Sequence, residues 1–409
     1  MRTQIMRIAV ATMVVASAAG AARAEKKYDP GVSDTEIKIG NIMPYSGPAS
    51  SYGVIGQTEA AYFNMINDEG GINGRKIKFI SYDDAYSPPK AIEQARKLVE
   101  SDEVLLIFQS LGTPSNSAIM KYMNTKRVPQ LFVASGGTKF GDPKNFPWTM
   151  GFQPNYQSEG RIYAKYILDH FPDSKIAVFW QNDDAGKDQF KGLKDGLGDK
   201  VGMIIADKSY EVSDPSIDSQ IVALHDSGAD IFFSWAAPKG SAQAIRKVGE
   251  LGWKPKFFLA NTATTVASVL KPAGLEYAKG IISTEYVKDP TDPKWKDDPG
   301  VAKWRAFMTK YFPEGDQANS NTAYAYVESQ AMVQVLKQCG DELTRANVMK
   351  QAANLKNFTS DMLLPGIMVN TSPDDYFPIE QMQLMRFNGE AWEQFGDVIT
   401  GEVGHGATH

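Results

Sequence analysis

The chain of 409 residues has few of the side chains on which most catalytic and metal sites depend. It holds one cysteine, Cys339, so no disulfide can form within the chain, although an oxidising compartment is allowed. The motifs H-E-x-x-H, G-x-S-x-G, G-x-x-x-x-G-K and G-x-G-x-x-G are absent. The four histidines are His170, His225, His405 and His409. We therefore expect no enzyme, and neither a metal nor a cofactor.

Strong charge of one sign and long apolar runs are also missing. The net charge is -5 without basic tracts, so neither nucleic acid nor an anionic membrane surface is an expected partner. The run from Ile8 to Ala18 has about eleven residues, whereas a membrane-spanning helix needs roughly 20. It follows Arg2 and Arg7 and precedes Ala-Arg-Ala at residues 22–24, which is typical of an export signal. We expect cleavage after Ala24, a periplasmic location, and no lipid anchor because the residue directly after that site, Glu25, is not a cysteine.

Strands and helices alternate along the remaining chain of about 385 residues, which is enough for two domains. Four strands separated by helices are expected between residues 36 and 134, and a similar series between residues 157 and 260. Helices of this length imply crossover connections, so each series predicts a parallel, doubly wound sheet. Residues 302–338 and 344–352 have a helical pattern, and Asn388-Gly389 between apolar runs predicts a hairpin. The predicted fold is α/β with two Rossmann-like lobes.

Three loops after strands of the first series contain candidate binding residues, because ligands of open parallel sheets sit beyond the carboxyl ends of the strands. The loop at residues 44–53 carries Tyr52. In residues 110–114, Thr113 is the expected N-cap and a proline the first helical residue, and such a helix start suits a carboxylate. Residues 135–138 (SGGT) add two glycines and two hydroxyls. A single loop of this composition most often only forms a turn. The expected position of all three loops at one edge of the sheet favours a ligand-binding site.

The second series offers aromatic and acidic candidates. Trp180 and Trp235 end two of its strands, where we expect their side chains to face a cleft, although an aromatic residue there is more often part of the core. The pairs Asp83-Asp84 and Asp183-Asp184 could suggest metal or acid chemistry. Adjacent strand residues point to opposite faces and no histidine is near, so a solvated or turn-capping role is favoured.

Four stretches resemble the substrate-binding proteins of ABC transporters of the branched-chain-amino-acid type. They are IGNIMPYSGPASSYG at residues 39–53, INDEGGINGRKIKFISYDDAYSPPKA at 66–91, RKVGELGWKPKFFLAN at 246–261 and GIISTEYV at 280–287. The resemblance implies a type I periplasmic binding fold with three hinge crossings, a small-molecule ligand enclosed between two lobes, and a membrane permease as partner. We expect a monomer.

The resemblance also implies where the lobes divide. Crossings are expected near residues 151–154, near residues 283–286 and around Met382. The N-terminal lobe would comprise residues 26–152 and 285–381, and the C-terminal lobe residues 153–284 and 382–409. In related amino-acid binders, main-chain groups and hydroxyls of two loops hold the ligand carboxylate, and a first-loop tyrosine contributes. The matching positions here are Leu111, Gly112, Thr113, Ser135, Gly136, Gly137 and Tyr52.

The seat for the ligand ammonium differs from that of the related binders. At the position of the acidic residue that pairs with the ammonium in those binders, this chain has Asn261. At the positions of two of their pocket tyrosines it has Ala185 and Ala236. Loss of a charge-assisted bond costs roughly 1.5–3 kcal/mol, about 10- to 150-fold in affinity. The space left by the tyrosines would let Trp180 and Trp235, with Tyr52, stack on a flat ligand.

These differences lead to the hypothesis of a carboxylate ligand with an aromatic body and no α-amino group, such as a benzoate-, cinnamate- or phenylpyruvate-like acid. If the alignment with the related binders is shifted by one residue, Asp183 or Asp184 could supply the missing negative charge. A branched-chain or other amino acid, or a urea or amide, is the alternative ligand.

Overall fold

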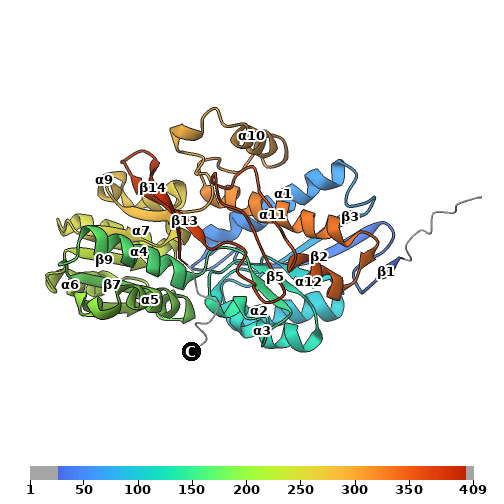
Figure 1. The fold of residues 1–409 in the computed structure, drawn as a ribbon, viewed down its shortest axis with the longest axis horizontal. Helices are drawn as coiled ribbons and strands as arrows, with labels where there is room; N and C mark the ends of the chain where they lie inside the picture. The colour runs from blue at the N-terminus through green and yellow to red at the C-terminus, as the bar shows by residue number, and fades with distance from the viewer. Residues whose placement is uncertain (1–25, 402–409) are drawn as a thin grey trace, which may run out of the picture.

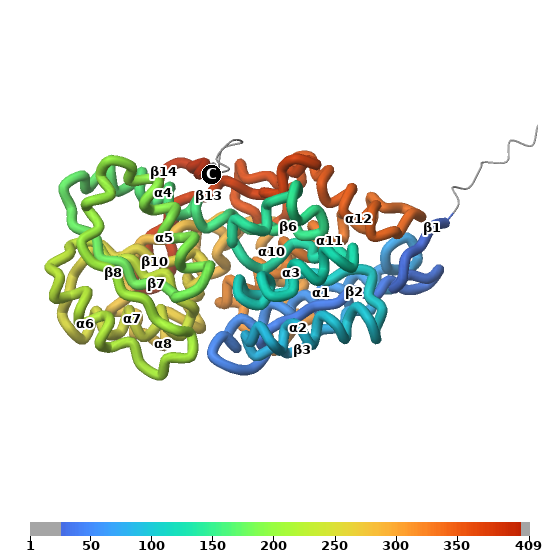
Figure 2. The backbone as a smooth tube through the Cα atoms, turned by 90° about the horizontal axis from the view of Figure 1, so that it is seen from below, coloured from blue at the N-terminus to red at the C-terminus, as the bar shows by residue number. Residues whose placement is uncertain are grey.

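The computed structural model describes residues 26–401 and shows an α/β chain folded into two lobes (Figure 1). Figure 2 shows these lobes side by side along the long axis, one mainly green and yellow, the other mainly blue, cyan and orange. The predicted export signal, with its cleavage after Ala24, lies outside the described residues.

The N lobe is built on a parallel sheet of five strands in the order β3-β2-β4-β5-β6. Every residue of β4 and β5 is buried, because helices cover both faces of the sheet, and apart from Gln130 these strands are apolar without alternation. The strands are β2 (Glu36–Met43), β3 (Lys76–Asp83), β4 (Leu106–Phe108), β5 (Gln130–Val133) and β6 (Thr149–Gly151).

Helices from both ends of the chain cover the N-lobe sheet. They are α1 (Val54–Asp68), α2 (Pro88–Arg96), α3 (Thr113–Lys126), α10 (Pro299–Tyr311), α11 (Ser320–Cys339) and α12 (Arg345–Ala352). The pair α1 and α11 packs through aromatic edges, with the ring centroids of Tyr62 and Tyr326 5.2 Å apart (Figure 1). A short pair, β1 (Lys27–Tyr28) with β12 (Glu342–Leu343), joins the two segments.

The C lobe has a sheet of seven strands in the order β14-β13-β11-β10-β9-β7-β8. Its strands are β7 (Ile176–Gln181), β8 (Ile204–Tyr210), β9 (Ile231–Trp235), β10 (Lys256–Leu259), β11 (Ile282–Glu285), β13 (Gln381–Phe387) and β14 (Trp392–Thr400). Strands β7 to β11 are parallel, whereas β13 and β14 form the predicted hairpin. Asn388 holds its turn by accepting hydrogen bonds from the main chain of Glu390 and Ala391.

The C-lobe helices are α4 (Tyr156–His170), α5 (Asp184–Leu197), α6 (Asp218–Asp226), α7 (Pro238–Glu250), α8 (Lys271–Ala273) and α9 (Leu275–Ala278). The chain passes between the lobes after β6, after β11 and before β13. The sequence pattern of residues 201–210 predicts a strand from Val201, but a 3₁₀ helix over Gly198–Met203 comes first and β8 begins at Ile204. No helix within residues 26–401 has the length and apolar character needed to cross a bilayer.

Candidate functional site

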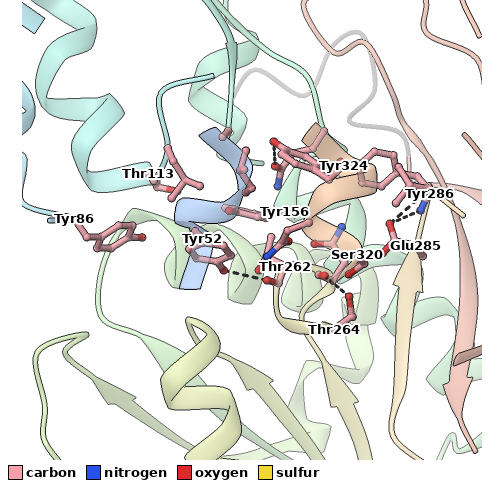
Figure 3. Close-up of a pocket in the computed structure, with 18 residues that line it drawn as sticks. Tyr52, Tyr86, Thr113, Tyr156, Thr262, Thr264, Glu285, Tyr286, Ser320 and Tyr324 are labelled. Atoms are coloured by element: carbon pink, nitrogen blue, oxygen red, sulfur yellow. Dashed lines mark hydrogen bonds between the residues drawn. The ribbon is translucent and has the colours of Figure 1, made fainter. Parts of the chain in front are cut away.

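A cavity lies between the lobes, where the carboxyl ends of strands from both sheets meet (Figure 3). It holds about 660 Å³ of empty space, including its mouth. The lining residues from the N lobe and its C-terminal helices are Tyr52, Ile55, Tyr86, Leu111, Gly112, Thr113, Ala134, Ser320, Asn321 and Tyr324. Those from the C lobe and the crossings are Gln153, Tyr156, Asn261, Thr262, Thr264, Glu285, Tyr286 and Val287. None of these lining residues is a lysine, arginine or histidine.

One end of the cavity is the start of α3. Gly112, rather than the predicted Thr113, is the N-cap, and no side chain within the described residues caps this helix. Gly112 has a φ of 96°, and a Cβ there would lie 2.5 Å from Cε2 of Tyr86, so only glycine fits. The first amides of an uncapped helix can donate hydrogen bonds to an anion, and the helix dipole favours negative charge there.

Hydroxyl groups gather beside this helix start. The Thr113 and Ser135 hydroxyl oxygens are 2.6 Å apart, and the main-chain N–H of Gly137 donates to the Ser135 hydroxyl. The carbonyl of Gly136 accepts from the N–H of Tyr156. Burial raises the pKa of the Tyr156 hydroxyl to about 12, and this rise is partly opposed by hydrogen bonding of that hydroxyl to the main chain of Gly136 and to the hydroxyls of Ser135 and Thr113. Of this group, Thr113 and Tyr156 line the cavity, while residues 135–137 support them from behind.

Five tyrosines line the cavity along its length: Tyr86 near Thr113, Tyr52 and Tyr156 in the middle, and Tyr324 and Tyr286 towards Glu285 (Figure 3). Burial raises the pKa of each, so all five hydroxyls are neutral at pH 7. The Tyr52 hydroxyl donates to the carbonyl of Thr262 (3.0 Å) and thereby links the N lobe to the C lobe. The rings supply flat, amphipathic walls that suit an aromatic ligand.

The opposite end of the cavity holds a buried carboxyl group, Glu285, at the end of β11 (Figure 3). Its Oε1 accepts hydrogen bonds from the main-chain N–H groups of Tyr286 (2.9 Å) and Val287 (3.3 Å). Burial raises the pKa of Glu285 to about 8 in spite of these two bonds. This acidic residue was missed in the sequence, although it lies in the stretch GIISTEYV and at the carboxyl end of a strand, which is itself a signal of a binding position.

Asn261, the position of the expected acidic partner, lines the cavity with Oδ1 buried and without a hydrogen-bond partner in residues 26–401. Its main-chain N–H donates to Oε1 of Glu159 (2.8 Å), a buried residue of α4. Burial raises the pKa of Glu159 to about 7. Glu159 also accepts from the Tyr163 hydroxyl and, more weakly, from Gln189, so its oxygens are occupied.

The expectation that Trp180 and Trp235 face the cleft is wrong. Trp235 is 1% exposed and packs in the core, its ring centroid 4.7 Å from that of Phe233. Phe233 and Trp235 are two residues apart on β9 and therefore share one face of the sheet, which α4 and α5 cover. Trp180 is half-buried, and its indole N–H donates to Asp207. Side chains at a strand end still project across the sheet rather than along the strand.

Four other candidates also lie away from the cavity. Ala236 belongs to the C-lobe core and Ala185 to the first turn of α5, so neither enlarges the site. Asp183 caps α5 by accepting from the N–H groups of Ala185 and Gly186. Asp184 forms an ion pair with Lys139 of the N lobe at 2.7 Å. Neither aspartate supplies the charge that the shifted comparison allowed.

The structure thus brings five of the twelve predicted residues to the cavity: Tyr52, Leu111, Gly112, Thr113 and Asn261. The sequence reasoning missed most of the tyrosines, because Tyr324 is on a helix from which no binding residue was expected and Tyr86 lies in a loop after β3 that was not considered. Within residues 26–401 no cluster of three histidine, cysteine, aspartate or glutamate side chains is arranged to hold a metal ion.

Comparison with known proteins agrees with the fold. A "Leu/Ile/Val-binding protein homolog 1" of Brucella suis is 24% identical over 336 residues, covering 80% of this chain and 85% of that protein. A Thermus thermophilus branched-chain amino acid ABC transporter protein with bound valine has a TM-score of 0.80 at 14% identity, covering 90% of this chain and 97% of that one. A Rhodopseudomonas palustris ABC transporter solute-binding protein in complex with 4-hydroxybenzoate has a TM-score of 0.75 at 16% identity, covering 89% and 97%.

The resemblance noted in the sequence is confirmed by the family whose description is "Periplasmic binding protein", which matches residues 36–391. The lobes, their parallel sheets and the cavity between them are the corresponding architecture. The protein belongs to the periplasmic binding protein family.

Proposed function

We propose that this protein is the periplasmic solute-binding component of an ABC importer and that its ligand is a small aromatic carboxylate. The observation that carries the ligand class is an inter-lobe cavity with the uncapped start of α3 at one end and walls of buried tyrosine rings. A carboxylate at that helix start would accept hydrogen bonds from main-chain amides and from the Thr113 hydroxyl. The body of the ligand would lie among the rings.

Binding by this scheme couples to closure of the lobes. The cavity takes walls from both lobes, so a ligand contacts both only when they are together. The Tyr52–Thr262 hydrogen bond and the Lys139–Asp184 ion pair also span the lobes and favour the closed form. A membrane permease would then recognise that form. No step requires a chemical change of the ligand.

An α-amino acid is the second candidate, and Glu285 favours it by placing a carboxyl group in the cavity. The position of that group counts against it. Thr113 and Glu285 lie at opposite ends of the cavity in Figure 3, whereas the carboxylate and ammonium of an α-amino acid are attached to one carbon. A ligand seated at α3 would therefore leave its ammonium far from Glu285 and next to Thr113.

Thermal-shift measurements on the purified protein test the ligand class. We expect benzoate, cinnamate or phenylpyruvate to raise the melting temperature and leucine and valine to have no effect. Thr113→Val, which removes the hydroxyl at the expected carboxylate seat, should reduce the shift. Stabilisation by leucine or valine with none by aromatic acids would overturn the proposal. Chemically unchanged ligand after incubation is expected, and its conversion would indicate an enzyme instead.

A further inference from the structure

The two oxygens of the Glu285 carboxyl group have different roles. Oε1 is occupied by the N–H groups of Tyr286 and Val287. Oε2 accepts no hydrogen bond within residues 26–401, although the side chain is 5% exposed and lines the cavity. Oε2 is thus the oxygen that Glu285 can offer to a ligand, because its partner is already held by the main chain.

Other polar atoms of the cavity are also unpaired among the described residues. The Tyr286 hydroxyl and Asn261 Oδ1 are both buried without a hydrogen-bond partner. A buried polar atom left without a partner costs about 1–3 kcal/mol. Such atoms, together in a cavity, indicate where a polar group of the ligand completes the hydrogen bonding.

From this geometry we propose that Glu285 is a specificity-determining residue: its Oε2 forms a hydrogen bond with a hydroxyl group at the end of the ligand farthest from its carboxylate, donating while Glu285 is protonated and accepting when it is ionised. The proposal rests on the proposed function, which seats that carboxylate at the start of α3. The ligand is then an aromatic acid with a second polar group across the ring, as the placement of Thr113 and Glu285 at opposite ends requires (Figure 3).

A hydroxyl group suits this position better than an ammonium. Burial favours the uncharged form of Glu285, and the nearby acidic groups Asp289 and Glu159 oppose its ionisation further. An ammonium would require an ionised Glu285, whereas a hydroxyl group can both donate and accept and so pairs with either form without adding a charge. No lysine, arginine or histidine lines the cavity to offset an added negative charge.

Isothermal titration calorimetry on the full chain tests this with matched ligands: benzoate, 4-hydroxybenzoate, 4-aminobenzoate and 4-(aminomethyl)benzoate, and the corresponding cinnamates for a longer span. We expect the hydroxy acid of at least one series to bind about tenfold more tightly than the unsubstituted acid. This comparison needs no variant, so it stands even where a substitution impairs folding.

Glu285→Leu removes Oε2, and the tenfold gain of the hydroxy acid should disappear in this variant. Glu285→Gln should keep the gain, since its carbonyl oxygen can keep the two main-chain bonds while its NH₂ donates in place of Oε2. Asp289→Asn is the control, because Asp289 is a buried carboxyl near the same crossing that does not line the cavity. It should leave the gain unchanged.

Three outcomes overturn the inference while leaving the proposed function intact. They are equal affinity for the hydroxy and unsubstituted acids in both series, a gain that survives Glu285→Leu, and tighter binding of the aminomethyl acid than of the hydroxy acid. Binding of none of these acids overturns the proposed ligand class itself, and the inference with it. The two failures are therefore distinguishable.

Discussion

At one end of the cavity the polar groups belong mainly to the main chain, and at the other to buried acidic side chains. The α3 end consists of helix amides and the Thr113 hydroxyl around Gly112, and it contains no ionisable group other than tyrosines. The opposite end has Glu285, with Glu159 just behind Asn261. The first end has a fixed polarity, because helix amides donate at every pH. The second end depends on protonation.

This difference explains how a cavity without a lining cation can still suit an anion. The carboxylate is matched by dipoles at α3, which do not need a counter-charge inside the cavity. The acidic end avoids repelling it by remaining largely protonated, since burial raises the pKa of Glu285 to about 8. The two ends are therefore complementary only below the pH at which Glu285 ionises.

The largest expected effect is on the pH dependence of stability. Burial raises the pKa of several carboxyl groups: Glu285 to about 8, Glu159 to about 7, Asp289 to about 6, and Glu59 and Glu328 well above the usual value. Folding favours their protonated form, so this stability is full below about pH 4.5 and is lost as the pH rises towards 8. Urea denaturation across this range should show a falling free energy of unfolding.

Glu159→Gln measures how much one carboxyl group contributes to the pH dependence of the free energy of unfolding. Its shift, from 4.5 to about 7, corresponds to a contribution on the order of 3 kcal/mol that is lost with rising pH. The variant should therefore show a shallower fall, while Glu93→Gln on the exposed face of α2 should not. An unchanged pH profile in Glu159→Gln would show that this carboxyl group is ionised in the folded protein.

The next largest effect concerns the end of the cavity formed by the start of α3. Gly112→Ala would place a Cβ 2.5 Å from the Tyr86 ring and force alanine into a φ of 96°. We expect a loss of about 1–3 kcal/mol of stability and a 10- to 100-fold weaker affinity for the aromatic acid. Denaturation and calorimetry give the two values.

Gly74→Ala is the control for Gly112→Ala. Gly74 has a similar φ of 83°, but its Cβ would meet nothing within 4 Å, and it is remote from the cavity. The same backbone cost is expected without a change in affinity. If both variants bind the acid equally well, the start of α3 is not where the carboxylate binds.

The contrast between the ends also explains which features the sequence could predict. The helix start was recognisable because a strand, a glycine and Thr-Pro occur in a fixed local order. Glu285 was not, because β11 has four residues that are all buried and therefore lack the alternation that reveals a strand. Its importance depends on two sheets meeting, which no local pattern records.

The Trp235 error has a similar origin. Its place at a strand end was predicted correctly, but the direction of its side chain depends on which face α4 and α5 cover. The βα alternation and the Asn388-Gly389 hairpin, by contrast, are local properties, and the strands and helices formed close to the expected residues. Tyr86 and Tyr324 reach the cavity from segments far apart in the sequence.

The smallest effect tests the link between the lobes. Tyr52→Phe removes the hydroxyl that donates to the Thr262 carbonyl across the cleft but keeps the ring. A neutral hydrogen bond contributes about 0.5–1.5 kcal/mol, so affinity should weaken about 2- to 12-fold through a less populated closed form. Tyr82→Phe is the control, because its hydroxyl bonds Asp102 within the N lobe. Small-angle scattering should show more open molecules for Tyr52→Phe alone, and equal scattering and affinity in both variants would mean that this bond does not hold the lobes together.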